Sequence, residues 1–407
     1  MNAQSPQVRL ENAPVEIIDG DRGKNYPSQN ELHESGFCLF LSANNVTPDG
    51  FRFETCQFID EAKDRALRKG RLTRNDVVMT TRGTLGNVGY YSSAIPHENV
   101  RINSGMVILR VDETRLRSRY LYFALQSQST VQQINSLRSG AAQPQLPIRD
   151  IKKILVGLPE PAAQDRIVDL VAAYDDLIAN NRRRIELLEQ SARLLFKEWF
   201  VHLRYPGHEH DNVVDGVPEG WTRQPLSNAA MQAKEKVHPT DVAGNTVYVG
   251  LEHIPRRSVT ILEWGTADAV TSDKYLFKER DILFAKIRPY LHKVGFALVD
   301  GITSSDAVVV RAQDQRQYCF LLHLLSSDLF IAVTSKTVRE GSKMPRADWD
   351  YLMERDILIP SYTLIAAFDE IIEPILKQQR TLALAIRKLA EARDLLLPRL
   401  MDGRLTA

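Results

Sequence analysis

Basic side chains gather in two short stretches of this sequence. Residues 63–88 hold seven lysines and arginines against two acids, and residues 274–293 hold six against two. Local positive charge of this kind is typical of surfaces that bind phosphate groups, although one such stretch alone more often forms a solvated face. The formal net charge is only +1, so the chain is not basic all over and acids elsewhere balance these stretches.

Each basic stretch leads into a turn that contains glycine or proline, TTRGTLGN in the first case and AKIRPYLHK in the second. Arginine pairs well with guanine, and asparagine with adenine, in the major groove of DNA. Turn side chains beyond the phosphates could therefore reach bases, with Arg82 and Arg288 on equivalent turns. The candidate contacts in these turns are Arg82, Thr84, Asn87, Lys286, Arg288, Tyr290 and Lys293.

Two further kinds of loop fit the same chemistry. DGDRGKNYP, at residues 19–27, is a turn bounded by glycine, and RSGAAQPQ at 138–145 resembles REGSKMPR at 339–346. A plain structural turn explains either loop equally well. The candidate contacts in these loops are Arg22, Lys24, Asn25, Tyr26, Arg138, Gln143, Arg339, Lys343 and Arg346.

Motifs for common catalytic reactions are missing from the sequence. It has no glycine-rich phosphate loop ending in Lys-Ser or Lys-Thr, no G-x-G-x-x-G after a strand, and no zinc-binding H-E-x-x-H or paired C-x-x-C. The Asn/Asp-Pro-Pro-aromatic tetrapeptide of amino methyltransferases is absent too. His208, His210 and Asp211 lie close together, but a solvated linker explains them better than a metal site. We therefore predict no catalytic residue, no metal and no cofactor in this chain.

The elements that must position the candidate loops occur twice. Residues 140–200 align with residues 341–401 at a constant shift of 201 without a gap. The identical pairs include Gly140/Gly341, Pro144/Pro345, Pro159/Pro360, Ile185/Ile386, Leu188/Leu389, Leu194/Leu395 and Leu195/Leu396. A duplicated unit predicts internal pseudo-twofold symmetry, suited to a target that itself has two halves. Because the two basic stretches occupy matching places in the repeat, phosphate binding is favoured over a solvated face.

Each copy ends in a long apolar seam whose steps alternate between four and three residues. This is the a/d rule of a coiled coil, and it lasts for more than four heptads in each copy. We predict that the two helices pack antiparallel; the alternative is two amphipathic helices in ordinary cores. The first seam comprises Ile167, Val171, Tyr174, Ile178, Asn181, Ile185, Leu188, Ala192, Leu195 and Trp199. The second comprises Phe368, Ile372, Ile375, Gln379, Leu382, Ile386, Leu389, Arg393, Leu396 and Leu400.

The predicted fold class is α+β, with two mixed α/β domains separated by the two long helices. We expect a first mixed domain at 1–157, a helical region at 158–203 and a Gly/Pro-rich linker at 204–220. A second mixed domain at 221–358 and a second helical region at 359–407 follow. We also expect single helices near 118–136 and 318–335. The three scattered cysteines, the ordinary composition and the lack of a long apolar run indicate the cytoplasm and no membrane.

Several blocks of this sequence, taken together, resemble the DNA specificity subunit of type I restriction-modification systems. The blocks are LPEPAAQDRIVDLVAAYDDLIANNRRRIELLEQSARLLFKEWFV, PEGW at the start of the second half, and the closing LLLPRLMDGRL. DGDRGKNYP and TTRGTLGNVGYY also look like segments of one type of target-recognition domain. The resemblance covers essentially the whole chain.

The resemblance implies two target-recognition domains, each holding one half of a split, asymmetric site in double-stranded DNA. The paired helices would set the number of unread base pairs and help to dock two modification (methyltransferase) subunits, which bring S-adenosylmethionine and methylate adenine. Two restriction (motor-nuclease) subunits, which use ATP and Mg, can join for cleavage. The chain departs from the family pattern at SYTLIAAFDEIIEP, where Pro374 should kink the second helix or delay its start.

Two rival readings stay open on the sequence alone. One is a stand-alone DNA-modifying enzyme with a site of unknown type, and methyl transfer or cleavage by the purified chain would favour it. The other is a coiled-coil scaffold that binds only proteins. Salt-dependent, sequence-specific binding of duplex DNA would exclude the scaffold and favour a non-catalytic reader of DNA.

Overall fold

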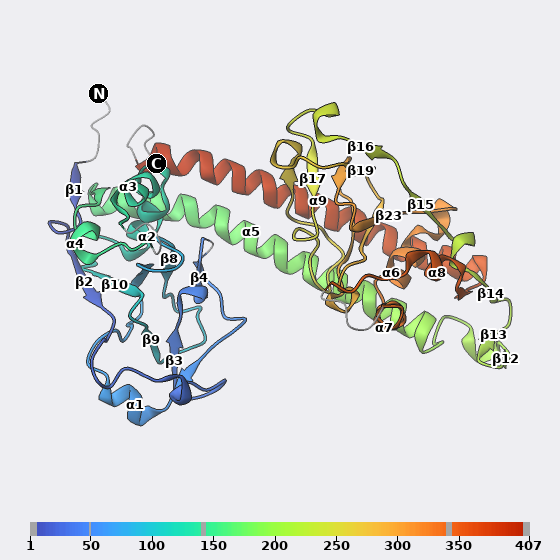
Figure 1. The fold of residues 1–407 in the computed structure, drawn as a ribbon, viewed down its shortest axis with the longest axis horizontal. Coiled ribbons are helices and arrows are strands. Elements are labelled where there is room, and N and C mark those ends of the chain that lie inside the picture. Colours follow the sequence, from blue (N-terminus) through green and yellow to red (C-terminus); the bar gives the residue numbers. More distant parts are fainter. Residues whose placement is uncertain (1–5, 49, 140–143, 339–343, 402–407) are drawn as a thin grey trace. The chain divides into compact units, whose positions relative to one another are not determined.

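The computed structural model describes residues 6–48, 50–139, 144–338 and 344–401. The chain divides into two compact units (Figure 1), the first made of residues 1–176 and 390–407 and the second of residues 177–389. Each unit combines strands with helices, in agreement with the predicted mixed fold class. The candidate residues Gln143, Arg339 and Lys343 lie outside the described part of the chain.

The first unit contains a four-stranded antiparallel sheet in the order β2-β10-β7-β8 and a three-stranded sheet in the order β6-β3-β9. Its strands are β1 (Gln7–Arg9), β2 (Val15–Asp19), β3 (Cys38–Leu41), β4 (Val46–Thr47), β5 (Gly50–Phe51), β6 (Phe58–Ile59), β7 (Val77–Thr80), β8 (Val88–Tyr90), β9 (Val100–Ile102), β10 (Met106–Val111) and β11 (Leu155–Gly157). Its short helices are α1 (Glu61–Ala66), α2 (Ser118–Gln126), α3 (Gln128–Leu137) and α4 (Ile148–Ile151).

The second unit repeats this plan with a four-stranded sheet in the order β15-β23-β20-β21 and a five-stranded sheet in the order β16-β19-β22-β17-β18. Its strands are β12 (Val213–Val214), β13 (Val217–Pro218), β14 (Thr222–Pro225), β15 (Ala230–Ala233), β16 (Lys236–Val237), β17 (Val247–Val249), β18 (Gly265–Thr266), β19 (Lys274–Phe277), β20 (Ile282–Ala285), β21 (Val294–Phe296), β22 (Gly301–Thr303), β23 (Ala307–Ala312) and β24 (Asp356–Ile359). Its short helices are α6 (Tyr318–Leu325), α7 (Asp328–Lys336) and α8 (Trp349–Glu354).

The internal repeat extends beyond the matching sequence into the strands. In both units the second sheet contains a parallel pair, β3 with β9 and β17 with β22, amid antiparallel neighbours. The outer pair β1-β11 likewise corresponds to β14-β24. The two units therefore share these strand pairings even where their sequences differ, and the second unit adds two strands, β16 and β19, to its second sheet.

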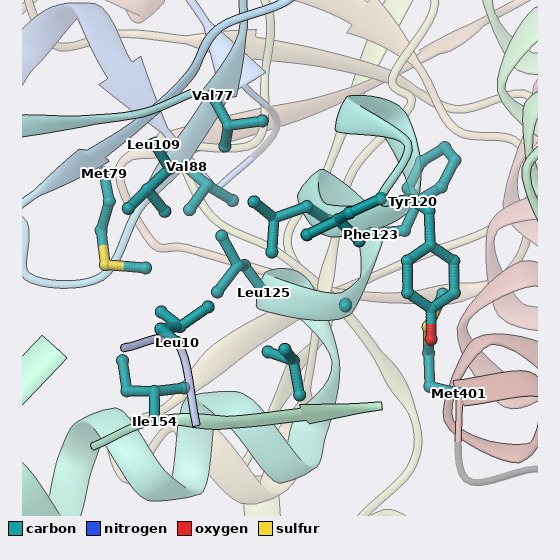
Figure 2. Close-up of a cluster of buried hydrophobic side chains, with 14 of the residues drawn as sticks. Leu10, Val77, Met79, Val88, Leu109, Tyr120, Phe123, Leu125, Ile154 and Met401 are labelled. Carbon is teal, nitrogen blue, oxygen red and sulfur yellow. The ribbon is translucent and has the colours of Figure 1, made fainter. Parts of the chain in front are cut away.

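Alternation of side chains along the inner strands builds the core of the first unit. Val77 and Met79 of β7 join the cluster under α2, while Val78 between them joins the cluster facing the three-stranded sheet. Figure 2 shows the first cluster, with Leu109 of β10 on the strand side and Tyr120 of α2 on the helix side. Because both faces of this sheet are covered, β7 is apolar from Val77 to Met79 and β10 is apolar from Met106 to Leu109.

The single helices expected near 118–136 and 318–335 are each broken in two. Ser127 separates α2 from α3, and its side chain accepts a hydrogen bond from the Thr130 N–H. Ser327 does the same between α6 and α7, with Phe330 as the donor. Serine at such a position competes with the helix ladder and caps a new helix, so the correction has the same cause in both units.

The two long helices are α5 (Pro161–Phe196), which continues as a π-helical turn over Lys197–Val201, and α9 (Tyr362–Met401). None of the twenty predicted seam positions is exposed. Pro374 does not delay the start of α9, because the helix begins at Tyr362 and continues without a break past Pro374. The predicted linker at 204–220 contains the two-stranded hairpin β12-β13.

Among the described residues, no single helix is long and apolar enough to cross a membrane. One bent pair, Gln315–Leu325 with Asp328–Lys336, meets that test through length and composition only, with an angle of 67° between its halves.

Candidate nucleic-acid interface

The turn between β7 and β8 carries Arg82 in the first unit. β7 is an inner strand, so its end fixes where the turn begins. The N–H groups of Thr81 and Arg82 donate to the carbonyl oxygen of Gly105 at 2.7 and 3.3 Å. Arg82 also forms an isolated β-bridge with Gln145. Two of the predicted contact loops, that of Arg82 and that of Gln145, therefore lie side by side.

The turn between β20 and β21 has the same surroundings in the second unit. The Lys286 N–H donates to the Asp306 carbonyl at 3.1 Å, and the Ala347 N–H donates to the Lys286 carbonyl at 2.8 Å. Ile287 forms the isolated bridge here, with Arg346. The β20–β21 turn thus meets the segment that contains Arg346, as the β7–β8 turn meets the segment that contains Gln145.

Each of the two bridges contains one arginine, on opposite sides. Arg82 lies on the turn and faces Gln145, whereas Arg346 lies on the neighbouring segment and faces Ile287. The turns are equivalent, as predicted, but Arg82 and Arg288 are not equivalent residues. Because Gln145 and Arg346 correspond in the repeat, the two bridges show that Arg82 corresponds to Ile287. Arg288, the next residue, therefore corresponds to Gly83.

The backbone bends in the same way in both turns, with different residues at the bends. Gly83 and Gly86 have φ angles of 76° and 79° in the first turn. Arg288 and His292, the corresponding residues, have φ angles of 48° and 55° in the second. The left-handed region costs a residue with a side chain about 1–2 kcal/mol, and glycine avoids this cost. Such strain concentrates at functional sites, which draws attention to Arg288.

Most basic side chains of the first stretch are engaged within the fold. The engaged pairs are Lys63 with Glu31, Arg65 with Glu61, Arg71 with Asp64, and Arg74 with the carbonyls of Ser92 and Ile95. The remaining Arg68, Lys69 and Arg82 make no side-chain hydrogen bond or ion pair with any residue that the structure describes. Of these three, only Arg82 lies on the β7–β8 turn.

The second basic stretch shows the same division. The engaged pairs are Lys274 with Ser272, Lys278 with Asp300, Arg280 with Glu373, and Lys293 with the Leu251 carbonyl. Burial lowers the pKa of Lys293. Lys286 and Arg288 have no side-chain partner among the described residues, and both lie on the β20–β21 turn. In both units, therefore, a turn at the end of an inner strand carries cations that make no side-chain hydrogen bond or ion pair with the described part of the chain.

Several other candidate side chains have partners inside the first unit. Asn25 donates to the Ala66 carbonyl at 3.0 Å, and the Tyr26 ring packs edge-on against Phe40. The carbonyl of Ala43 accepts from Thr84, that of Val46 accepts from Asn87, and Arg22 pairs with Asp19 at 3.2 Å. These polar atoms stabilise loops. Lys24 and Arg138 are exposed and have no such partner among the described residues.

In the second unit, Tyr290 stands out from its turn with 58% of its surface exposed. Arg346 forms an ion pair with Asp306, with 3.2 Å between a guanidinium nitrogen and Oδ1. Both side chains remain open to solvent, at 59% and 28%. Asp306 is an acid that contacts two basic residues, Lys286 through its carbonyl and Arg346 through its carboxylate, and Gly105 occupies its place in the first unit.

A repeated buried ion pair below the turns was missed by reasoning from the sequence. Arg110 binds Asp76 through two nitrogens at 2.8 and 2.7 Å, and Arg311 binds Asp281 at 2.8 and 2.9 Å. Both aspartates are almost fully buried. The signal that could have found the pair is the shared Asp directly before an apolar strand, in NDVVMT and RDILFA. These pairs fix the strands from which the two turns project.

One group of side chains has the composition of a metal site. Cys319, Asp369 and Glu373 have ligand atoms within 4.8 Å of one another. However, Arg280 binds both oxygens of Glu373, and this contact holds the pKa of that carboxyl below its usual range. A dication would have to displace the guanidinium. The group therefore fits an ion-paired anchor between Arg280 and α9 better than a metal centre.

Comparison with known proteins gives one consistent result. Residues 15–190 match the family model described as the type I restriction modification DNA specificity domain. The MjaIX specificity subunit of Methanocaldococcus jannaschii is 22% identical over 374 residues, covering 88% of this chain and 82% of that protein. The EcoDI specificity subunit of Escherichia coli is 25% identical over 239 residues, covering 52% of each chain.

The fold has a counterpart among solved structures. The crystal structure of a type I restriction-modification system S subunit from M. genitalium superposes with a TM-score of 0.58 at 13% identity, covering 97% of this chain and 96% of that one. This likeness concerns the fold. Together with the sequence matches, it confirms the resemblance to type I specificity subunits, a class of non-catalytic DNA-recognition subunits.

Proposed function

We propose that this specificity-subunit chain reads a bipartite, asymmetric site in double-stranded DNA, one half with each unit, and docks modification subunits. The observation that carries the proposal is the pair of equivalent turns. In each basic stretch the fold gives most cations a hydrogen-bond or ion-pair partner, while Arg82 in one turn and Lys286 and Arg288 in the other keep no partner among the described residues.

The chemistry of the turns supports contact with DNA in the major groove. A guanidinium can bind a phosphate oxygen, or the O6 and N7 atoms of guanine with two hydrogen bonds. Each unit places one arginine at its bridge, Arg82 or Arg346, and the second adds Arg288 on a strained backbone. A left-handed arginine in a position where the other unit uses Gly83 is unfavourable for stability. Its presence is explained if the side chain binds a ligand.

Packing of the long helices supports their role as an antiparallel spacer. In the second unit, Phe196 of α5 contacts Phe368 of α9 with ring centroids 6.1 Å apart. Seven residues earlier on α5, Glu189 meets Thr260, whose hydroxyl lies 3.5 Å from Gln379 of α9. From one contact to the next, the residue number rises on α5 and falls on α9, as expected for an antiparallel coiled coil.

The first unit supports the same direction through its own contacts. Asp175 of α5 forms an ion pair with Arg393 of α9 at 2.7 Å. Ile167, closer to the start of α5, belongs to the same core cluster as Leu400 at the end of α9. Arg393 was a polar position of the predicted seam, and its partner on the other helix explains how a charged residue is tolerated there.

Exposed apolar side chains on α5 fit the docking of two modification subunits. Leu187 and Leu194 are one heptad apart and are 45% and 62% exposed. Those subunits would bring S-adenosylmethionine and methylate adenine, and two restriction subunits would bring ATP and Mg. This chain would supply no catalytic residue and no cofactor, and it would act in the cytoplasm.

Exchange of one domain tests this proposal. The adenine-methylated sequence would be determined in DNA from cells that carry this chain and its modification partner. Residues 1–157 would then be replaced by the equivalent domain of a relative with a different target. We expect one half-site to change while the other half-site and the spacer stay the same. A change in both half-sites would refute the division of labour, and methylation by the purified chain alone would favour a stand-alone enzyme.

A further inference from the structure

Asp306 is an unusual residue for a surface that binds DNA. It follows a short turn in which the Ser304 hydroxyl accepts a hydrogen bond from the Asp306 N–H at 3.2 Å. Its own carbonyl accepts from the N–H of Lys286, at the start of the β20–β21 turn. The backbone of Asp306 therefore fixes that turn, as Gly105 does in the first unit with no side chain. The carboxylate is an addition that the shared backbone does not require.

Among the residues that the structure describes, the carboxylate has one charged partner. Its Oδ1 lies 3.2 Å from a guanidinium nitrogen of Arg346, which stands at the bridge with Ile287. An ion pair as exposed as this one contributes little to stability. It does restrict the long arginine side chain, and an arginine already held in one conformation loses less entropy when it binds a base. The guanidinium keeps further N–H groups for a second partner.

We propose that Asp306 is a positioning residue that makes Arg346 selective for a base edge. This proposal rests on the proposed function, because it assumes that the β20–β21 turn meets DNA. The carboxylate acts in two ways. It directs the remaining N–H groups of Arg346, and its negative charge opposes the approach of phosphates. The repulsion weakens binding to DNA whatever its sequence. The sequence whose base accepts the directed N–H groups of Arg346 regains affinity, so it is preferred over other sequences.

The charge in the turn makes the effect of a substitution predictable in sign. In Asp306→Asn the repulsion of phosphates is removed, and Arg346 is free to bind a phosphate itself. We expect affinity for a duplex of unrelated sequence to rise by up to about fivefold, with the slope against salt steeper by about 0.9. At one position of one half-site, discrimination between bases should fall by about fivefold or more.

The test uses the full chain in complex with its modification subunits. The probes are duplexes that carry its methylated sequence, their single-base variants, and one duplex of unrelated sequence. Asp306→Glu keeps the charge and should retain most of the discrimination. Asp314→Asn serves as the matched control, since Asp314 also pairs with an exposed arginine, Arg316, at 2.7 Å but away from the turns. We expect the control to leave the discrimination unchanged.

A second background separates positioning from direct contact. In Arg346→Ala, addition of Asp306→Asn should have no further effect on discrimination. An equal loss in both backgrounds would overturn the positioning role, as would unchanged discrimination in Asp306→Asn alone. A wild-type complex with no preference for any sequence would overturn the proposed function as well. Specific binding by wild type with no effect of Asp306→Asn would overturn this inference only.

Discussion

Replacement of Arg288 by glycine should stabilise the second unit and weaken its binding to DNA. Arg288 has a φ of 48°, in the left-handed region, and its N–H donates to the Pro345 carbonyl at 2.8 Å. Glycine keeps that hydrogen bond and adopts the same backbone without strain, as Gly83 does in the first unit. The Arg288 side chain is exposed and makes no hydrogen bond, ion pair or ring contact with the described residues.

The expected change in stability follows from two opposing contributions. Relief of the left-handed conformation contributes about 1–2 kcal/mol. The greater conformational freedom of glycine stabilises the unfolded chain and lowers the free energy of unfolding by about 0.5–1 kcal/mol. The difference lies between about 0 and about 1.5 kcal/mol, so the free energy of unfolding should rise by about 0.75 kcal/mol, measured from urea unfolding of the full chain. If Arg288 contacts one phosphate, Arg288→Gly should also reduce the slope of log binding constant against log salt concentration by about 0.9.

Arg280→Gly provides a control with the opposite sign. Arg280 is also left-handed, with a φ of 72°, but its guanidinium binds Glu373 and lies over the Tyr318 ring. Its removal leaves the half-buried Glu373 carboxylate with only the more distant Lys377, at 3.5 Å, as a cationic partner among the described residues, so this variant should be less stable than wild type. If Arg288→Gly binds DNA with the affinity and salt slope of wild type, the reasoning that strain is tolerated there for DNA contact is refuted.

Three further predictions follow from the same structure. Arg82→Ala should leave the free energy of unfolding within about 0.5 kcal/mol and reduce specific DNA binding by roughly 1–3 kcal/mol, whereas Arg74→Ala should reduce mainly stability; binding titrations beside urea unfolding would separate them. Burial lowers the pKa of His323 to about 4, whereas the pKa of histidine in the unfolded chain is about 6.5. The contribution of His323 to stability is therefore complete above about pH 6.5 and is lost as the pH falls toward 4, because the unfolded chain takes up the proton first. His323→Phe should remove this part of the acid destabilisation, measured by urea unfolding across that pH range. One added heptad near both Ile185 and Ile386 lengthens each helix by roughly 10 Å, so the preferred spacer should grow by about three base pairs with weaker binding, and an unchanged spacer in the methylated sequence would count against a ruler.

The sequence alone determined the repeat and the faces of the long helices. Alternating steps of three and four residues place apolar side chains on one side of a helix whatever surrounds it. Every predicted seam position is accordingly buried or half-buried. The break at Ser127 was not predicted, because the helical pattern on either side is continuous and only the capping geometry reveals the gap.

For the site, the basic stretches and turns were visible in the sequence. The sequence did not show which cations have no side-chain partner among the described residues. The acids that pair with them come from distant parts of the chain. Glu31 reaches Lys63, and Glu373 of the last helix reaches Arg280. The strain at Arg288 is likewise visible only in the backbone angles. Local spacing fixes which residues share a face of an element, whereas pairing between charges depends on which elements pack together, and only the tertiary structure decides that.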